Sequence, residues 1–456
     1  MANDFPGPAS VQPTLKRALG LTGLILYGII LIQPTAPMPL FGAAAVEGRG
    51  HVVIAILIGM VGMLFTAISY GRMANAYPSA GSAYAYVSRE IHPALGYITG
   101  WSIIFDYIMN PIICVVWMSM AAKNIIPQIP FAAYAVAFTA LFTVMNLRGI
   151  EASSRTNGII AAGLGVVIVL FIGAAVRYLW LHPPEGAAGW TRPFYDPQTF
   201  SIQAVSGGAA LAVLAYIGFD GISTLSEEAH NPRRNILLAT VLVCVITGVL
   251  CSIQVYAAQL IWPGTEFPDV DTAFCYVAGK AGGQWLFQTV NAALLVATIG
   301  SGAGAQLGAG RLLYSMGRDD AIPRKFFGAV NPRTRIPSNN ILLLGVIILV
   351  GAFTVTYALG ADLLNFGALI AFMGVNLSAL LHGYVRAARK SFWNLASPVT
   401  GFVVCAYLWW SLGRTAHVVG TIWLCTGVLY GAWRTSFFRK PIQFAALDND
   451  DGQAAK

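Results

Sequence analysis

The stretch QPTAPMP, residues 33–39, decides the fold, because it places three prolines within six positions of an apolar segment. Proline lacks the backbone N–H that a helix requires, so this stretch predicts a helix break. A second stretch, GFDG at residues 218–221, flanks an acid with glycines inside another apolar segment. Unwound backbone survives at membrane depth only where it is buried in protein or lines a cavity. Two interrupted helices at matching positions in two halves are typical of transporters built from inverted repeats.

Charged residues are rare and unevenly placed along the 456-residue chain. They make up 10% of it, against roughly 25% in a soluble protein, and 57% of the residues are hydrophobic. Twelve segments are free of charge or, in one case, broken only by Asp106, and each could cross a hydrocarbon core of ~30 Å. We therefore predict an all-α polytopic membrane protein with about twelve transmembrane helices. The segments are 18–46, 50–71, 91–122, 124–147, 156–176, 197–219, 235–265, 281–310, 336–361, 363–385, 391–413 and 415–433.

The basic residues predict the orientation. With twelve crossings both termini share one side, and that side collects 21 of the 27 lysines and arginines. Positive residues concentrate on the cytoplasmic side of a membrane protein. We therefore expect a multi-pass protein of the inner or plasma membrane with both termini in the cytoplasm. The net charge of +8 reflects this bias, so the expected partner is the lipid bilayer and not nucleic acid.

The layout of the two breaks predicts how the chain is divided. We expect one transporter domain at 16–440, preceded by a disordered tail at 1–15 and followed by a tail at 441–456. Within the domain, the expected repeats are 16–182 and 198–390, with two further helices at 391–436. A glycine-rich cluster at 300–310 is interpreted either as tight helix packing or as a backbone-lined site.

Two acids stand out within the apolar segments. A charged group in mid-membrane costs about 2.5–3.5 kcal/mol on insertion scales, so it normally has a function or a partner. Asp220, at the second break, is a candidate for binding an amine or a proton, or for organising the unwound backbone. Asp106 lies next to Tyr107 and one turn before Asn110 on the same helix face. It binds substrate, carries a proton, or is a buried structural acid.

Aromatic and hydroxyl groups near the breaks are weaker candidates. Phe219 and Tyr216 flank the second break, where a ring can cover a substrate or hold an ammonium, or simply pack in the core. Thr298 and Ser301 are candidates for a coupling-ion site, although a hydroxyl in a membrane helix commonly bonds its own backbone.

Motifs for enzymatic chemistry are missing from the sequence. The six histidines and six cysteines are dispersed, and neither HExxH, nor a Walker A loop, nor a nucleophile elbow occurs. We predict no catalytic residue, no cofactor and no metal site, and hence no enzyme.

Four stretches together resemble the amino acid–polyamine–organocation superfamily of permeases. They are YGRMANAYPSAGSAYAY at 70–86, the segment 96–101, NLRG at 146–149, and YIGFDGISTLSEEAHNP at 216–232. Within the superfamily, the putrescine-importer-like permeases are the subgroup that the chain resembles most. The resemblance extends over about residues 16–440.

The resemblance implies a LeuT-type fold, with five-plus-five inverted repeats and a substrate pocket between the two broken helices. It also implies site residues. Members that carry amino acids usually have a Gly-Ser-Gly-like stretch at the first break, whose amides hold a carboxylate. Here Pro34-Thr35-Ala36-Pro37 replaces it, which puts carboxylate binding in doubt. The expected substrate-binding residues are Thr35, Ala36, Met38, Asp106, Tyr107, Asn110, Tyr216, Gly218, Phe219, Asp220 and Ser301, with Asp106 and Asp220 also for the coupling proton. From their position near Arg233 and Arg234, Glu227 and Glu228 are candidates for gating together with Arg72, or form a plain surface ion pair.

The predicted function is secondary active import of amino acids or polyamines by alternating access, coupled to protons in preference to sodium. Two acids in the core, and the loss of the stretch that would bind a substrate carboxylate, favour a polyamine. Amino acids remain an equal alternative. An exchanger on the same fold is a further alternative, as is a nutrient sensor that does not transport. The short C-terminal tail argues against the sensor.

Overall fold

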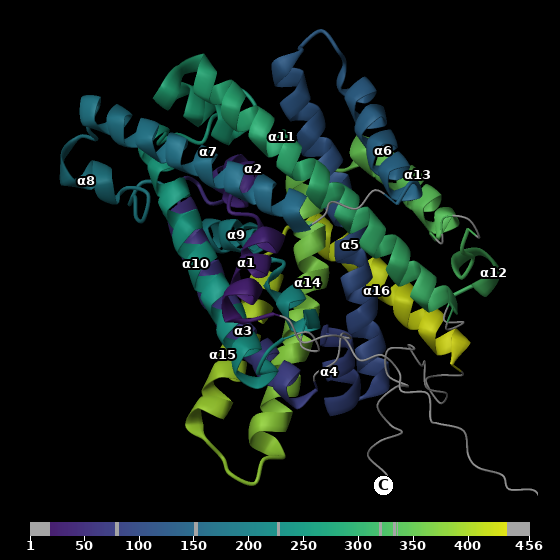
Figure 1. Ribbon diagram of the computed structural model, residues 1–456. Helices are drawn as coiled ribbons and strands as arrows, with labels where there is room; N and C mark the ends of the chain where they lie inside the picture. The colour runs from purple at the N-terminus through teal and green to yellow at the C-terminus, as the bar shows by residue number, and fades with distance from the viewer. Residues whose placement is uncertain are drawn as a thin grey trace, which may run out of the picture.

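The structure, a computed structural model, describes residues 19–77, 82–149, 154–225, 229–318, 322–331, 334 and 336–435. These residues form helices and no β-strand, apart from a single β-bridge between Leu19 and Ala229. The predicted all-helical fold is therefore confirmed. The elements, shown in Figure 1, are α1 (Leu21–Ile32), α2 (Pro37–Glu47), α3 (Val52–Ala76), α4 (Ser82–Glu90), α5 (Pro93–Ile125), α6 (Phe131–Leu147), α7 (Ser154–Leu181), α8 (Gly186–Thr191), α9 (Ile202–Ala212), η1 (Val213–Tyr216), η2 (Phe219–Leu225), α10 (Pro232–Ile261), α11 (Ala273–Arg318), α12 (Arg324–Phe327), α13 (Ser338–Thr354), α14 (Tyr357–Leu380), η3 (Leu381–Val385), α15 (Phe392–Trp410) and α16 (Arg414–Arg434).

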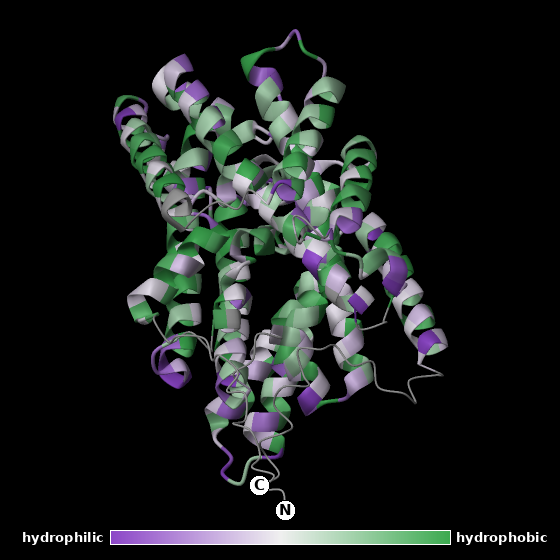
Figure 2. Cartoon of the chain, turned by 45° about the vertical axis from the view of Figure 1, so that its right-hand side comes forward, coloured by the Kyte–Doolittle hydropathy of each residue, from purple (hydrophilic) through white to green (hydrophobic). Residues whose placement is uncertain are grey.

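Most of these helices are membrane-spanning candidates. Within the described residues, nine are long and apolar enough to cross a membrane, and the bent pair α1–α2 makes a tenth. Helices α6 and α13 are apolar but have 17 residues each, about 26 Å, slightly less than a hydrocarbon core of ~30 Å. In Figure 2, hydrophobic residues cover much of the bundle. The multi-pass membrane architecture agrees with expectation, and the count of twelve stays a prediction.

The first predicted break is confirmed. Helix α1 ends at Ile32 and α2 begins at Pro37, with an angle of 54° between them. Between the two helices, Gln33 takes a left-handed backbone conformation with φ of 66°. The prolines at 34, 37 and 39 remove the amide hydrogens that a continuous helix would need, so the chain turns instead.

The second predicted break is confirmed as well. Helix α9 tightens into the 3₁₀ turn η1, Ile217 is extended, and Gly218 has φ of 124° before η2 begins. Only glycine adopts such a backbone angle readily. A Cβ atom on Gly218 would lie 3.4 Å from the amide nitrogen of Ile32 at the end of α1. The two breaks therefore touch each other.

Two helix boundaries differ from expectation. The charge pattern predicted a gap between helices at Asp362, but α14 begins at Tyr357 and runs through this residue. Asp362 accepts a hydrogen bond of 3.2 Å from the Gly413 amide, which helps a helix to tolerate the carboxylate. Helix α11 begins at Ala273, upstream of the predicted start, but a non-helical turn at Gly283 divides it into two helices. The second of these begins close to the predicted start at 281.

Helices α5 and α14 form an antiparallel pair in the centre of the molecule. Gly367 of α14 packs directly against the carbonyl of Ser102, and Gly360 packs against the side chain of Ile113. The register matters for the site, because it sets which residues of the two helices lie at the same depth. Asp106 of α5 lies near the level of Gly367, while the start of α14 lies beyond Ile113.

Helix α16 is fastened to α5 by a pair of tryptophans. The Trp101 indole N–H donates to the Trp423 carbonyl at 2.9 Å, and the Trp423 indole donates to the Trp101 carbonyl at 3.1 Å. Their rings stack with centroids 4.8 Å apart, and Phe105 stacks on Trp423 at 5.0 Å. This contact holds the helix that carries Asp106.

A buried carboxylate joins three segments at the side of the molecule where the basic residues collect. Glu90 at the end of α4 is 2% exposed. Its oxygens accept hydrogen bonds from the Tyr77 hydroxyl at 2.6 Å, from His382 at 2.6 Å and from Arg386 at 2.8 Å. Tyr77 follows α3, and the other two follow α14, so Glu90 ties α3, α4 and the end of α14 together.

Candidate functional site

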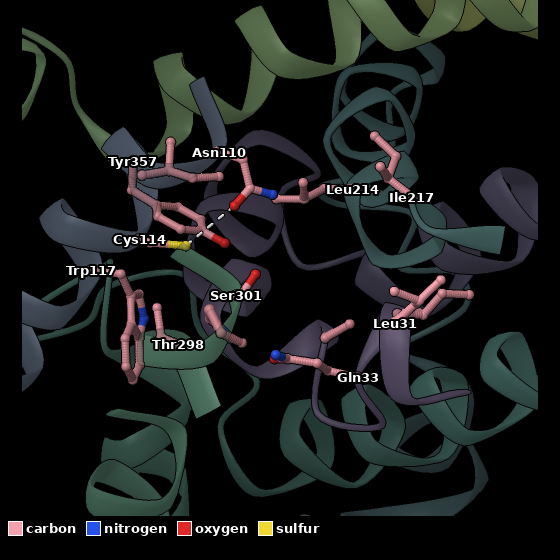
Figure 3. A pocket seen from close by; sticks show the side chains of 14 residues that line it. Leu31, Gln33, Asn110, Cys114, Trp117, Leu214, Ile217, Thr298, Ser301 and Tyr357 are labelled. Carbon is pink, nitrogen blue, oxygen red and sulfur yellow. Dashed lines mark hydrogen bonds between the residues drawn. The ribbon is translucent and has the colours of Figure 1, made fainter. Parts of the chain in front are cut away.

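A cavity lies where the two breaks face the central helices. Its volume is about 110 Å³, and apolar side chains line it together with several polar ones. Figure 3 shows these side chains converging from the α1–α2 break, α5, the end of η1, α11 and the start of α14. The lining residues are Leu31, Ile32, Gln33, Ala36, Pro39, Asn110, Ile113, Cys114, Trp117, Leu214, Ile217, Thr298, Ser301 and Tyr357. A mostly apolar cavity with a few convergent polar groups is the usual form of a small-molecule site.

The first break offers almost no amide hydrogen to a ligand. Three of the residues from 34 to 39 are prolines. The Ala36 amide donates to the Gln33 carbonyl at 3.0 Å, and the Met38 amide donates to the Thr35 carbonyl at 2.9 Å. Across this described stretch, only the Thr35 amide has no backbone acceptor. The start of α2 is therefore a poor site for a carboxylate, although a helix N-terminus ordinarily attracts anions.

The second break is equally short of free amides. The Gly218 amide donates to a carboxylate oxygen of Asp220 at 3.2 Å, and the Gly221 amide donates to the Gly218 carbonyl at 3.1 Å. By contrast, α1 and η1 both end at the cavity, and the carbonyl end of a helix carries a partial negative charge. The backbone around the cavity therefore favours a cation.

Asp106 and Asp220 lie outside the lining of this cavity but near each other. Their charges interact, and both side chains are partly exposed. Within the described residues, neither forms an ion pair. Tyr107, beside Asp106, is 40% exposed although it packs against Gly308 of α11. Asp106 and Tyr107 sit in the middle of α5, and Asp220 directly follows the second break, so we interpret their exposure as contact with an internal space.

The other residues predicted for substrate binding divide into two groups. Ala36, Asn110 and Ser301 line the cavity. Thr35 and Met38 are 1% exposed and lie outside the lining. Their roles in binding stay predictions.

The predicted aromatic residues of the second break pack in the core. The Tyr216 hydroxyl donates to the Ile56 carbonyl at 2.8 Å. Phe219 makes edge and tilted contacts with Tyr70 and Phe372, with centroids 5.6 and 5.4 Å apart. Both side chains are fully buried, so the geometry favours the packing alternative for this conformation.

Of the three predicted gating residues, only Arg72 lies within the described residues. Arg72 donates to the Trp393 carbonyl at 3.3 Å, a contact between α3 and α15. Glu227 and Glu228 lie outside the described residues. Within the described residues, no group of three or more His, Cys, Asp or Glu is placed to hold a metal ion.

Three of the lining residues that were missed in the sequence carry an amide or aromatic side chain. Gln33 donates from its side-chain amide to the Ala297 carbonyl of α11 at 3.3 Å. Trp117 and Tyr357 form the end of the cavity that is remote from the two acids. An aromatic residue inside an apolar segment carries no signal of its own, and a cavity-facing residue cannot be told from a core residue without the helix register.

The loop before α11 supports Trp117 and contains an acid that is sensitive to pH. The Trp117 indole donates to the Asp271 carbonyl at 2.7 Å. Burial, together with the nearby charge of Asp269, raises the pKa of the Asp271 carboxyl from the ordinary 3.8 to about 6. The folded protein therefore holds this proton to higher pH than the unfolded chain does.

We expect Asp271 to make the folded protein less stable as the pH rises from about 4 to about 6. In this window the unfolded chain has released the proton while the folded protein still binds it, so unfolding becomes more favourable with each step of pH. Asp271→Asn should remove this part of the pH dependence. Thermal unfolding of both proteins in detergent between pH 4 and 7 checks the prediction, and parallel curves would contradict it.

The family model for amino acid permeases matches residues 24–438, nearly the whole described chain. The chain belongs to the amino acid permease family. This confirms the resemblance found in the sequence and the predicted class of function, a permease. Since the relatives below are named as transporters or permeases, an enzymatic role has no support among them.

Several curated proteins are similar to this chain over almost their whole length. The low-affinity putrescine importer PlaP of Escherichia coli (strain K12) is 34% identical over 447 residues, covering 95% of this chain and 97% of that protein. The branched-chain amino acid permease BcaP of Bacillus subtilis (strain 168) is 26% identical, covering 93% and 94%. The methylthioribose transporter of the same Bacillus strain is 25% identical, covering 92% and 94%.

Proposed function

We propose that this permease imports a small organic amine, with putrescine-like diamines as the preferred class. The observation that carries the proposal is the state of the two breaks. Apart from the Thr35 amide, the amide hydrogens described above at the two breaks are missing or already bonded within the chain, whereas helix carbonyl ends and the carboxylates of Asp106 and Asp220 remain. This arrangement favours an ammonium and disfavours a carboxylate. The putrescine importer among the relatives supports the same choice.

We propose a LeuT-type architecture for this activity. It comprises twelve crossings, with inverted repeats at 16–182 and 198–390, further helices at 391–436, and both termini in the cytoplasm. The two mutually contacting breaks and the excess of basic residues on one side support it. In alternating access, the broken helices would move against α5, α11 and α14 while the cargo stays between them.

We propose protons as the coupling ion. Asp106 and Asp220 are the proton carriers. Among the described residues neither forms an ion pair with a basic residue, and their two negative charges repel each other, which favours a proton on one of them. The region near Thr298 is less suited to sodium, because the Thr298 hydroxyl donates to its own helix at 2.7 Å and the Ala297 carbonyl accepts from Gln33. Exchange of one amine for another would use the same groups.

Uptake into proteoliposomes tests the proposed function. Labelled putrescine and a panel of labelled amino acids are offered to the purified protein, with and without an inward proton gradient. We expect putrescine to accumulate and the gradient to increase its accumulation. Uptake of amino acids without uptake of putrescine contradicts the amine proposal. Accumulation that is the same with and without the gradient contradicts proton coupling.

A further inference from the structure

The end of the cavity farthest from the acids is built from two aromatic residues. Trp117 lies on α5, 11 residues beyond Asp106, and Tyr357 is the first residue of α14. In the antiparallel register of these helices, Tyr357 lies ten residues from Gly367, which faces the level of Asp106. At 1.5 Å per residue, about 15 Å of helix separates the two levels, but the Tyr357 side chain reaches back, and Figure 3 shows its hydroxyl close to Asn110, one turn from Asp106. Trp117 and Tyr357 form an aromatic end of the cavity, and the two acids lie outside its lining.

The Tyr357 hydroxyl is unused by the protein. The side chain is 5% exposed, yet within the described residues its hydroxyl forms no hydrogen bond. Figure 3 shows this hydroxyl directed into the cavity, close to Cys114 and Asn110. Buried hydroxyl groups normally have a partner. A ligand in the cavity is the partner that the geometry provides.

Trp117 lines the same end of the cavity, and a hydrogen bond holds its ring in place. It is 1% exposed, and its indole N–H is already bonded to the Asp271 carbonyl at 2.7 Å. The ring can therefore offer only its π-system to the cavity, and a ring face attracts an ammonium. No carboxylate and no basic side chain is among the residues that line the cavity, and Asp271 lies behind the aromatic end, where its carbonyl bonds Trp117.

We propose that Tyr357 and Trp117 form a second subsite, which binds the distal amine of a diamine whose first ammonium lies toward the acids. The Tyr357 hydroxyl accepts a hydrogen bond from the distal N–H, and the indole stabilises its charge. This inference rests on the proposed amine transport and makes Tyr357 the residue that distinguishes a diamine from a monoamine of equal length. Asn110, one turn from Asp106, lies along the path between the acids and the aromatic end.

The test compares ligands that differ only in the distal group. Each ligand is added unlabelled, and its inhibition of labelled substrate uptake is measured in the wild type and in Tyr357→Phe. Putrescine is compared with butylamine, and lysine with norleucine. The substitution removes one oxygen atom and keeps the ring, so folding is preserved. Tyr134→Phe is the matched control, because the Tyr134 hydroxyl bonds the Ile126 carbonyl away from the cavity.

We expect the wild type to bind putrescine more tightly than butylamine, and Tyr357→Phe to weaken putrescine about tenfold while changing butylamine less than twofold. The control should change neither. Equal losses for both ligands, or no loss for putrescine, would overturn the subsite. The proposed function fails separately: if lysine is carried and putrescine is ignored, the lysine–norleucine pair decides the role of Tyr357. If the wild type prefers the distal amine in neither pair, the inference is wrong.

Discussion

Asp220→Asn is expected to reduce amine uptake by at least about a hundredfold in kcat/KM, because a desolvated ammonium would lose its opposing charge. The substitution is conservative in every other respect. Asparagine retains a side-chain oxygen that can accept the Gly218 amide hydrogen at the place where Asp220 now accepts it at 3.2 Å. The turn at Gly218 should therefore persist. Initial rates of labelled putrescine uptake into proteoliposomes measure the effect.

Glu185→Gln is the matched control for this experiment, since Glu185 is an exposed acid of the loop before α8. It should transport like the wild type. Both variants should unfold at the temperature of the wild-type protein in detergent, which separates lost binding from lost folding. Uptake within about threefold of the wild type in Asp220→Asn would show that this carboxylate serves the backbone of the break and not the cargo.

Glu90→Ala should lower the free energy of unfolding by roughly 2–3 kcal/mol, because it removes a buried acceptor of charge-assisted hydrogen bonds. Tyr77, His382 and Arg386 would all lose their shared partner. His382 and Arg386 are about half exposed and regain water, which limits the loss. Denaturant or thermal unfolding in a fixed detergent measures the change.

Transport by Glu90→Ala separates stability from mechanism. If the contacts of Glu90 form only in some conformations of the transport cycle, the variant should take up less substrate than the wild type. This holds even at a temperature where the variant is fully folded. Glu185→Ala serves as the control, since the Glu185 carboxyl is exposed and has no side-chain partner among the residues that the structure describes. An unfolding curve identical to that of the wild type would contradict the role assigned to the buried carboxylate.

Both breaks could be predicted because they depend on the backbone chemistry of particular residues. Three prolines between 34 and 39 exclude a continuous helix in any surroundings. Gly218, followed closely by an acid and a second glycine, marks a backbone angle that other residues avoid. That the two breaks touch each other could not be read from the chain, because contact between residues so far apart depends on packing.

The aromatic end of the cavity could not be predicted for the same reason. Trp117 and Tyr357 lie in apolar surroundings where a core residue and a cavity residue have the same sequence pattern. The predicted boundary at Asp362 was wrong. A charged residue marks the end of a helix only where no polar group of the protein bonds it, and the Gly413 amide bonds Asp362. Asp106 and Asp220 were identified by their charge, but their position outside the lined cavity required the register of α5 against α14.

The prolines of the first break also have a thermodynamic consequence. The proline rings exclude a continuous helix whether or not cargo is bound, so the interruption between α1 and α2, with its angle of 54°, does not depend on cargo. Binding of cargo therefore requires no unwinding of backbone, and the protein loses little conformational entropy on binding. The heat capacity change measured by titration calorimetry should then be small and should scale with the apolar surface of the cargo alone.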